Sequence, residues 1–382
     1  MVIGIDASRA NKQNRTGVEW YSYHVIQELK KMTSPGVIPT NFVLYTNEKL
    51  RDGLEVVPDN WREKSLNWLP KYLWTQIRLW WELITNPPDV LYVSAHTIPF
   101  LPIPKKIKVV ITVHDVGFKR FPALYKKIQF WYHDLTMRKI KRRADIIITV
   151  SEFSKKEIIE LYGVDADKIK VTYLGYDKNK YKRINQPDES VLEKYKIKKP
   201  YLLFIGRLER KKNIINIIKS FILAAAKYPE LNLVLIGNAG NESEAIKQLI
   251  SDSGLGEKII RPGYVPEEDV PTIINLAEVF LFPTLYEGFG LPIVQALACG
   301  TPVIASDLEP HREVAGEAAV FVDPRQPAEI ADKIGFILSN EEYRKLLKEK
   351  GLKRAEIFSW TETARETMRW LQNPFRSEIS DF

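Results

Sequence analysis

The stretch from residue 279 to residue 302 constrains the fold of this chain more than any other. Val279–Phe282 is a short apolar run that predicts a buried strand, and Ile293–Ala298 predicts the start of a helix. The turn between them carries two glycines, a proline and one carboxylate, Glu287. A strand that feeds a helix through such a turn presents free backbone N–H groups, which can hold an anion such as a phosphate. The pattern also fits an ordinary strand–loop–helix junction in which Glu287 caps the helix.

The same alternation of strands and helices runs along the whole chain. It predicts the α/β class, with two parallel, doubly wound domains. The expected strands are 1–6, 41–45, 90–94, 107–113, 146–150 and 168–173 in the first half, and 201–205, 231–236, 258–261, 279–282, 303–305 and 319–322 in the second.

The domain boundaries are expected where this alternation pauses. Residues 1–178 form the N-terminal domain and residues 199–360 the C-terminal domain. The charged, proline-containing stretch 179–198 is interpreted as a linker. Residues 341–371 have helical character, and the final helix, within 361–382, is expected to return to the N-terminal domain.

Length and composition exclude several classes of protein. The 382 residues suffice for two domains, and 45% hydrophobic with 27% charged residues is typical of a globular protein. No apolar run approaches the ~20 residues of a membrane-spanning helix. Cys299 is the single cysteine, which excludes a disulfide framework and a cysteine metal cluster. The N-terminus starts as a strand without a signal-peptide pattern, so the expected location is the cytoplasm.

The positive charge lies in the N-terminal half. Residues 1–180 hold 29 Lys and Arg against 19 Asp and Glu, a net of +10, whereas residues 181–382 hold 27 against 29, a net of −2. Between Lys119 and Arg143, nine basic residues accompany one acid, Asp134. Such a face has three usual partners: nucleic acid, anionic lipid head groups or phosphorylated substrates.

A tryptophan-rich segment, residues 61–84, leaves two interpretations open. It contains five of the nine tryptophans, and its apolar residues from Leu73 to Ile84 follow helical spacing beside Lys71 and Arg78. One interpretation is a helix packed in the domain core. The other is a surface helix whose aromatic and cationic side chains meet a membrane interface or a lipid-linked acceptor.

Several motifs resemble the retaining, nucleotide-sugar-dependent glycosyltransferases of family 4, which have the GT-B fold. The most specific are Gly206-Arg207 with Lys212-Asn213, and Glu287-Gly-Phe-Gly-Leu-Pro followed by Gly300-Thr-Pro. The looser N-terminal matches are Thr16-Gly-Val, Val113-His-Asp and Val150-Ser-Glu-Phe-Ser. The resemblance spans most of the chain and implies two Rossmann-like domains that face each other across a cleft.

The resemblance implies transfer of a hexose from a nucleotide diphosphate sugar to an acceptor hydroxyl with retention of configuration. It implies synthesis of a polysaccharide or glycolipid and favours GDP-mannose as donor. Arg207 and Lys212 would grip the diphosphate, Glu287 would bind the donor sugar's hydroxyls, and His114 would line its pocket. Cations directed at a leaving group stabilise the negative charge that develops on it in the transition state, which accelerates the reaction. Asp115 is expected to orient His114 through a hydrogen bond.

The resemblance also implies a set of donor-binding positions, and one of them departs from the family pattern. The family has a second glutamate eight positions after the first, where this chain has Gln295. An amide can still bind the ribose hydroxyls but without a charge-assisted hydrogen bond, so donor affinity or nucleotide preference is in question. The donor-binding positions are Gly17, Gly206, Tyr264, Val265, Phe289, Gly290, Leu291 and Gln295.

No metal ion and no cofactor besides the donor are expected. Asp165-Ala166-Asp167 resembles a D-x-D metal motif, but its setting favours a solvated turn. The expected acceptor is lipid-linked or a saccharide, and the basic N-terminal domain would contact the inner face of an anionic membrane. A soluble small acceptor and a non-catalytic sugar-nucleotide-binding protein remain alternatives. Nucleic acid is not expected as a partner because no reading motif accompanies the basic residues.

Overall fold

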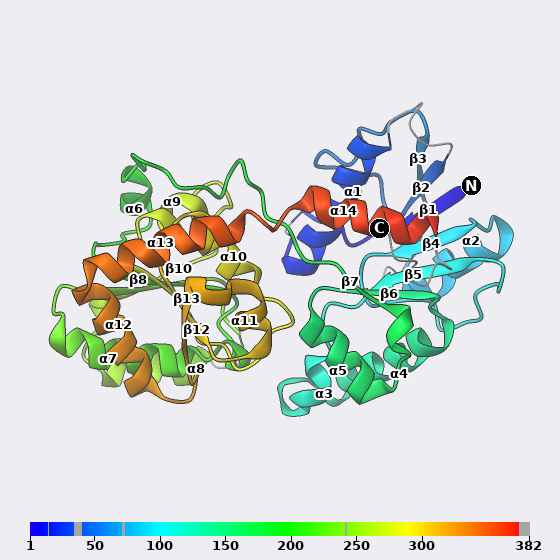
Figure 1. Cartoon of the computed structure of the whole chain (residues 1–382). Coiled ribbons are helices and arrows are strands. Elements are labelled where there is room, and N and C mark those ends of the chain that lie inside the picture. Colours follow the sequence, from blue (N-terminus) through cyan, green and yellow to red (C-terminus); the bar gives the residue numbers. More distant parts are fainter. Residues whose placement is uncertain (14, 34–39, 71–72, 241–242, 374–382) are drawn as a thin grey trace. The chain divides into compact units, whose positions relative to one another are not determined.

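The computed structural model describes residues 1–13, 15–33, 40–70, 73–240 and 243–373. The chain divides into two compact units, each described here by itself (Figure 1). Unit 1 contains Met1–Gly175 and the C-terminal residues from Trp360 onward, and unit 2 contains Tyr176–Ser359.

Unit 1 is built on a parallel sheet of seven strands in the order β3-β2-β1-β4-β5-β6-β7. Ile5 in β1 is in register with Leu44 of β2 on one side and Tyr92 of β4 on the other. The strands are β1 (Val2–Asp6), β2 (Asn41–Thr46), β3 (Trp61–Ser65), β4 (Val90–Val93), β5 (Lys108–Thr112), β6 (Ile146–Thr149) and β7 (Ile169–Val171).

Two helices of unit 1, α1 and α5, begin at caps that the sequence supplies. Ser151 accepts a hydrogen bond from the Ser154 amide (3.0 Å) at the start of α5, as its sequence predicts. Thr16 and Glu19 form a capping box at the start of α1. The helices are α1 (Gly17–Met32), η2 (Trp74–Leu79), α2 (Trp80–Thr85), α3 (Gly117–Arg120), η3 (Pro122–Leu124), α4 (Lys127–Arg143), α5 (Glu152–Tyr162), η4 (Ala166–Lys168) and α14 (Trp360–Gln372).

Unit 2 repeats this plan with six parallel strands in the order β10-β9-β8-β11-β12-β13. The strands are β8 (Tyr201–Ile205), β9 (Asn232–Ile236), β10 (Ile259–Gly263), β11 (Val279–Phe282), β12 (Val303–Ser306) and β13 (Ala319–Val322). The helices are α6 (Ser190–Lys194), η5 (Arg210–Lys212), α7 (Ile214–Lys227), α8 (Ser243–Asp252), η6 (Gly256–Lys258), α9 (Val270–Asn275), α10 (Leu291–Ala298), α11 (Glu309–Ala315), η7 (Gly316–Ala318), α12 (Pro327–Ser339) and α13 (Glu341–Ala355).

Both units are doubly wound, which confirms the predicted fold class. The strand order reverses between β1 and β4 in unit 1, and between β8 and β11 in unit 2. In open α/β sheets, ligands bind beyond the carboxyl ends of the strands at such a switch point. The fold therefore offers one ligand position in each unit.

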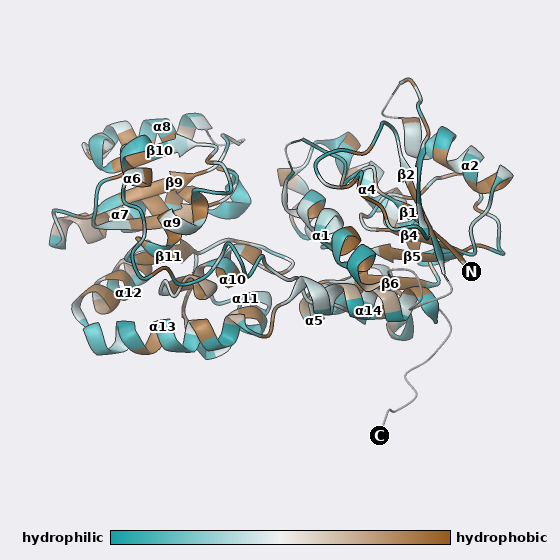
Figure 2. Cartoon of the chain, turned by 90° about the horizontal axis from the view of Figure 1, so that it is seen from above, coloured by the Kyte–Doolittle hydropathy of each residue, from teal (hydrophilic) through white to brown (hydrophobic). Residues whose placement is uncertain are grey.

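Apolar residues fill the interior of each unit. Figure 2 shows hydrophobic strands inside and hydrophilic surfaces on outer helices such as α13. Strands β4, β6, β11 and β12 are buried along their whole length, as expected of parallel strands covered on both faces. Within the described ranges, no helix is both long and apolar enough to cross a bilayer.

The tryptophan-rich segment is not one helix. Trp61 begins the edge strand β3 and is buried, whereas Trp74 opens the π-helical turn η2 and is also buried. Trp68 and Trp81 are exposed. The segment therefore combines a core role with a surface role, because its strand and helix parts face different surroundings. Lys71 lies outside the described residues.

Residues 179–198, interpreted as a linker, belong to unit 2. They include α6 and pack against α9: the Tyr195 hydroxyl donates to Asp269 (2.5 Å), and the Ile184 amide donates to Asn275 (2.8 Å). Polar side-chain contacts of this kind leave no apolar periodicity in the sequence.

The C-terminal helical stretch divides into α13, which belongs to unit 2, and α14, which belongs to unit 1. Helix α14 lies against α1, where the Trp360 ring stacks on His24 with ring centres 4.9 Å apart. The Thr363 hydroxyl also donates to the Tyr173 carbonyl (2.7 Å).

We predict that Gly4→Ala destabilises unit 1 by about 1–3 kcal/mol, the usual cost of overpacking a core. A β-carbon at Gly4 would lie 2.5 Å from Cε2 of Tyr45 and 3.1 Å from Cγ of Pro88. Urea denaturation measures the change in unfolding free energy. Gly17→Ala is the matched control, because its β-carbon would meet nothing within 4 Å and alanine is the better helix former. Equal stability of the Gly4→Ala protein and the wild type would contradict the packing account.

Candidate functional site

An ion pair joins the two strands that flank the switch point of unit 2. Lys212 ends η5, in the connection after β8, and Glu287 lies in the loop after β11. Their side chains form a salt bridge and are only 15% and 13% exposed. The Lys212 ammonium also lies 5.2 Å from the centre of the Phe282 ring. Two of the predicted site residues therefore meet, although 75 positions separate them in the sequence.

Asn213 fixes the backbone around this pair. It adopts the left-handed conformation (φ 62°), which asparagine tolerates better than most residues. Its side-chain amide donates to the carbonyls of Pro283 (2.8 Å) and Pro324 (2.6 Å). The Leu285 amide donates to the Lys211 carbonyl (2.8 Å). Three loops at the carboxyl edge of the sheet are thus tied together beside Lys212.

A buried histidine, His311, connects the segments that follow β11 and β12 in this region. His311 on α11 is fully buried, with Nδ1 3.2 Å from the Ser306 carbonyl and Nε2 3.4 Å from the Thr284 hydroxyl. Burial lowers the pKa of His311 to about 4, while the carboxylate of Glu287 acts in the opposite direction. The ring is therefore neutral near pH 7. The sequence prediction assigned no role to Asn213 or His311, although His311 is the single histidine of residues 176–359.

The loop after β11 ends at Gly290, the N-cap of α10, with a φ of 100° that favours glycine. A β-carbon there would lie 3.2 Å from Ile293. Phe289 is buried and packs edge-on against Phe358 (ring centres 5.6 Å apart), so its side chain anchors the loop. Leu291 is the first residue of α10, and the half-buried Gln295 lies one turn further on. The first amides of a helix have no partner within the helix, which suits them to an anion.

Arg207 stands apart from the Lys212–Glu287 pair. Its side chain is 68% exposed and lies 3.7 Å from Glu209. It follows Gly206, whose carbonyl comes so close to Gly237 that no β-carbon fits there. The exposed guanidinium remains available to a phosphate at the carboxyl end of β8.

Tyr264 and Val265, expected near the nucleobase, follow β10. Val265 is buried, whereas Tyr264 is 61% exposed. The connection after β10 therefore has one anchored residue and one aromatic side chain open to contact.

In unit 1, His114 follows β5 and is buried, with its ring edge-on to Tyr21 (ring centres 4.7 Å apart). Its Nε2 lies 3.2 Å from the Ser94 carbonyl, and burial lowers the pKa of the ring. The Ser94 carbonyl holds the ring, and Asp115 accepts a hydrogen bond from the Gly117 amide (2.9 Å), so the role of Asp115 in orienting His114 stays a prediction. Gly17 is exposed at the first position of α1.

The D-x-D sequence has a structural role. Asp165 caps the short helix η4 by accepting a hydrogen bond from the Asp167 amide (3.1 Å). Among the described residues, no three His, Cys, Asp or Glu side chains gather in a way that could hold a metal ion.

Comparison with known proteins identifies the family of the chain. The family model "Glycosyl transferases group 1" matches residues 187–354, and "Glycosyltransferase Family 4" matches residues 15–180. The O-antigen chain mannosyltransferase B of Escherichia coli is 34% identical over 267 residues, which cover 68% of this chain and 69% of that protein. The O-antigen chain mannosyltransferase RfbU of Salmonella typhimurium is 26% identical over 328 residues, covering 84% and 86%.

The fold has a close counterpart among solved structures. The sucrose-phosphate synthase of Thermosynechococcus elongatus superposes with a TM-score of 0.74 at 17% identity, covering 98% of this chain and 99% of that one. Together with the two doubly wound units and the sequence matches, this similarity shows that the chain belongs to the family 4 glycosyltransferases and has the GT-B fold.

Proposed function

We propose that the chain transfers mannose from GDP-mannose to a hydroxyl of a growing polysaccharide or glycolipid, with retention of anomeric configuration and without a metal ion or other cofactor. The observation that carries the donor half of this proposal is the Lys212–Glu287 pair at the switch point of unit 2. The printed names of two relatives, both O-antigen mannosyltransferases, support the sugar and the type of product.

The chemistry follows from the charges at this site. Breaking the bond between the sugar and the diphosphate places negative charge on the leaving oxygen. Lys212 is held in place beside Glu287, and Arg207 is exposed nearby in the sequence, so both cations could stabilise that charge. A lysine acts as a point charge, whereas an arginine can bind two phosphate oxygens at once. Amides at the start of α10 would add fixed dipoles.

Glu287 has a double role in this proposal. In the free protein it neutralises Lys212, which keeps the ammonium from being an unpaired, largely buried charge. When the donor binds, the phosphate offers Lys212 a second anion, and the carboxylate can accept hydrogen bonds from the sugar hydroxyls. Gln295 would bind the ribose through its amide.

No protein nucleophile is assigned. For retention, the acceptor hydroxyl would attack the anomeric carbon on the side from which the phosphate leaves, and the departing phosphate would take the acceptor proton. The protein then has to position both substrates and stabilise charge, which suits a site of cations and backbone amides.

We predict that Lys212→Ala lowers kcat for sugar transfer by roughly 10²-fold or more, as expected when a fixed stabilising charge is removed. The readout is release of the nucleoside diphosphate, with product identified by mass. Lys219→Ala is the matched control, because Lys219 is an exposed lysine on α7 of the same unit. Turnover of the Lys212→Ala protein within about threefold of wild type would refute the assignment. Measurable turnover by the wild type also excludes the non-catalytic alternative.

We propose that the enzyme works at the cytoplasmic face of an anionic membrane and that helix α4 docks there. Ile128, Trp131 and Leu135 follow helical spacing and are all exposed, Trp131 by 67%. Basic residues such as Arg138 and Arg142 are exposed on the same helix. An apolar stripe with basic neighbours suits a helix that lies in the interface of an anionic bilayer.

We predict that Trp131→Ser weakens binding to vesicles of phosphatidylglycerol and phosphatidylcholine, measured by co-sedimentation at low salt. Loss of an interfacial aromatic anchor removes apolar contact area, whereas added salt weakens the attraction of the basic residues. Phe336→Ser is the control, since Phe336 is an exposed aromatic residue of unit 2. Failure of the wild type to bind these vesicles would favour a soluble acceptor instead.

A further inference from the structure

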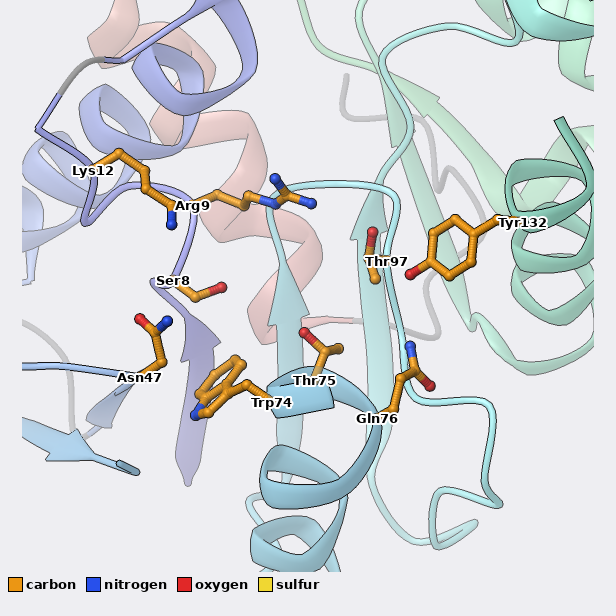
Figure 3. Close-up of a pocket in the computed structure, with 9 residues that line it drawn as sticks. All are labelled: Ser8, Arg9, Lys12, Asn47, Trp74, Thr75, Gln76, Thr97 and Tyr132. Carbon is orange, nitrogen blue, oxygen red and sulfur yellow. The ribbon is translucent and has the colours of Figure 1, made fainter. Parts of the chain in front are cut away.

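Unit 1 contains a cavity of about 290 Å³ that the donor chemistry does not use. Figure 3 shows its side chains arranged around one space, with the hydroxyls of Ser8 and Tyr132 directed toward it and the Trp74 indole nitrogen turned away. The residues that line it are Ser8, Arg9, Lys12, Asn47, Trp74, Thr75, Gln76, Thr97 and Tyr132.

The cavity lies where the topology of unit 1 predicts a ligand. Ser8, Arg9 and Lys12 follow β1, and Thr97 follows β4, the two strands between which the order of the sheet reverses. Asn47 follows the neighbouring strand β2. The cavity is therefore the counterpart in unit 1 of the Lys212–Glu287 position in unit 2.

Its walls are rigid on one side. Trp74 is buried, and its indole N–H donates to the Leu66 carbonyl (2.7 Å). Gln76 accepts a hydrogen bond from the Phe100 amide (2.7 Å), which ties the start of η2 to the loop after β4. These two side chains form a fixed surface, and the Gln76 amide retains donor capacity.

Most of the remaining polar groups can bind a ligand. Within the described ranges, the hydroxyls of Thr75, Thr97 and Tyr132 form no hydrogen bond with the protein, whereas the Ser8 side chain hydrogen-bonds to Asp6. Oδ1 of Asn47 is buried and has no partner either. A buried carbonyl oxygen without a partner is costly, so a ligand that donates to it would be favoured. Several hydroxyls and amides around a space at the lower end of the range for small-ligand sites match a monosaccharide.

Two cations distinguish this cavity from a neutral sugar site. Lys12 forms no ion pair with any described residue, and Arg9 lies 3.9 Å from Glu19 with its side chain 48% exposed. None of the described residues that line the cavity carries a carboxylate. The lining therefore has an excess of positive charge that an anionic ligand group would neutralise.

We propose that this cavity binds the sugar of the acceptor and that the acceptor carries an anionic substituent, a phosphate or a carboxylate, which Lys12 and Arg9 recognise. The identification of this ligand as the acceptor rests on the proposed function, whereas the binding of an anionic sugar to the cavity does not depend on it. Ser8, Asn47, Thr75, Thr97 and Tyr132 would bind the sugar's hydroxyls.

The test is calorimetric titration of the full chain with three probes: mannose 6-phosphate, methyl α-mannoside and inorganic phosphate, each in the presence of saturating GDP. The wild type should bind mannose 6-phosphate at least about tenfold more tightly than either other probe, since both the sugar and the anion contribute. If phosphate alone bound as tightly as mannose 6-phosphate, the cavity would be a simple anion site. If the neutral mannoside bound as tightly as mannose 6-phosphate, the cavity would not recognise the phosphate charge. Either result overturns the proposal.

Two variants assign the binding to the cavity. Lys12→Gln should weaken mannose 6-phosphate about tenfold and leave the mannoside unchanged, whereas Thr97→Val should weaken both sugars. Lys105→Gln is the matched control, because Lys105 is an exposed lysine that precedes β5, at the amino ends of the strands and away from the cavity at their carboxyl ends. An equal effect of Lys105→Gln, or no effect of Lys12→Gln, would contradict the assignment.

The same proteins separate this inference from the proposed function. GDP should bind the wild type, Lys12→Gln and Thr97→Val alike, because neither Lys12 nor Thr97 is one of the expected donor-binding positions. If the wild type did not bind GDP, the donor assignment would be overturned. The sugar titrations, repeated without GDP, would then still test whether the cavity binds an anionic sugar.

Discussion

The ion pair between Lys212 and Glu287 is the interaction on which the proposed donor site depends. It joins the loops that follow β8 and β11, the strands on the two sides of the switch point, and both side chains are largely buried. Two charges in such a place are stable only together, because either one alone would be an unpaired buried charge. The hydrogen bonds of Asn213 hold the surrounding backbone. The site is thus assembled before any ligand arrives, which lowers the cost of positioning the donor.

The two units use one topological rule for two different chemistries. In unit 2 the switch point carries a charge pair and a helix N-terminus, which suit a diphosphate. In unit 1 the equivalent position carries hydroxyls, amides and two cations around a cavity of about 290 Å³ (Figure 3). A glycosyl transferase needs both kinds of site, one for an activated donor and one for a hydroxyl-bearing acceptor. The proposed function assigns the first kind of site to unit 2 and the second to unit 1.

Much of the fold could be predicted from the sequence because buried parallel strands are short apolar runs. The sequence does not predict the edge strand β3, since Trp61-Arg-Glu-Lys-Ser is polar wherever it faces solvent. It predicts a linker at residues 179–198, because polar contacts, such as that of Tyr195 with Asp269, secure them to unit 2. Lys212 and Glu287 could be proposed from local motifs, whereas Thr97 and Asn47 could not. They are single polar residues after separate strands, and only the sheet order brings them to one cavity.

The most direct test of the central claim is a titration of the protein with guanosine, GMP and GDP, with the uridine and adenosine series in parallel. If Lys212 and the start of α10 hold the donor's diphosphate, affinity rises with each phosphate, and Lys212→Ala removes most of the advantage of the diphosphate over the monophosphate. The account would be contradicted if, in all three series, the nucleoside bound as tightly as its diphosphate. It would also be contradicted if Lys212→Ala kept the full affinity advantage of the diphosphate over the monophosphate.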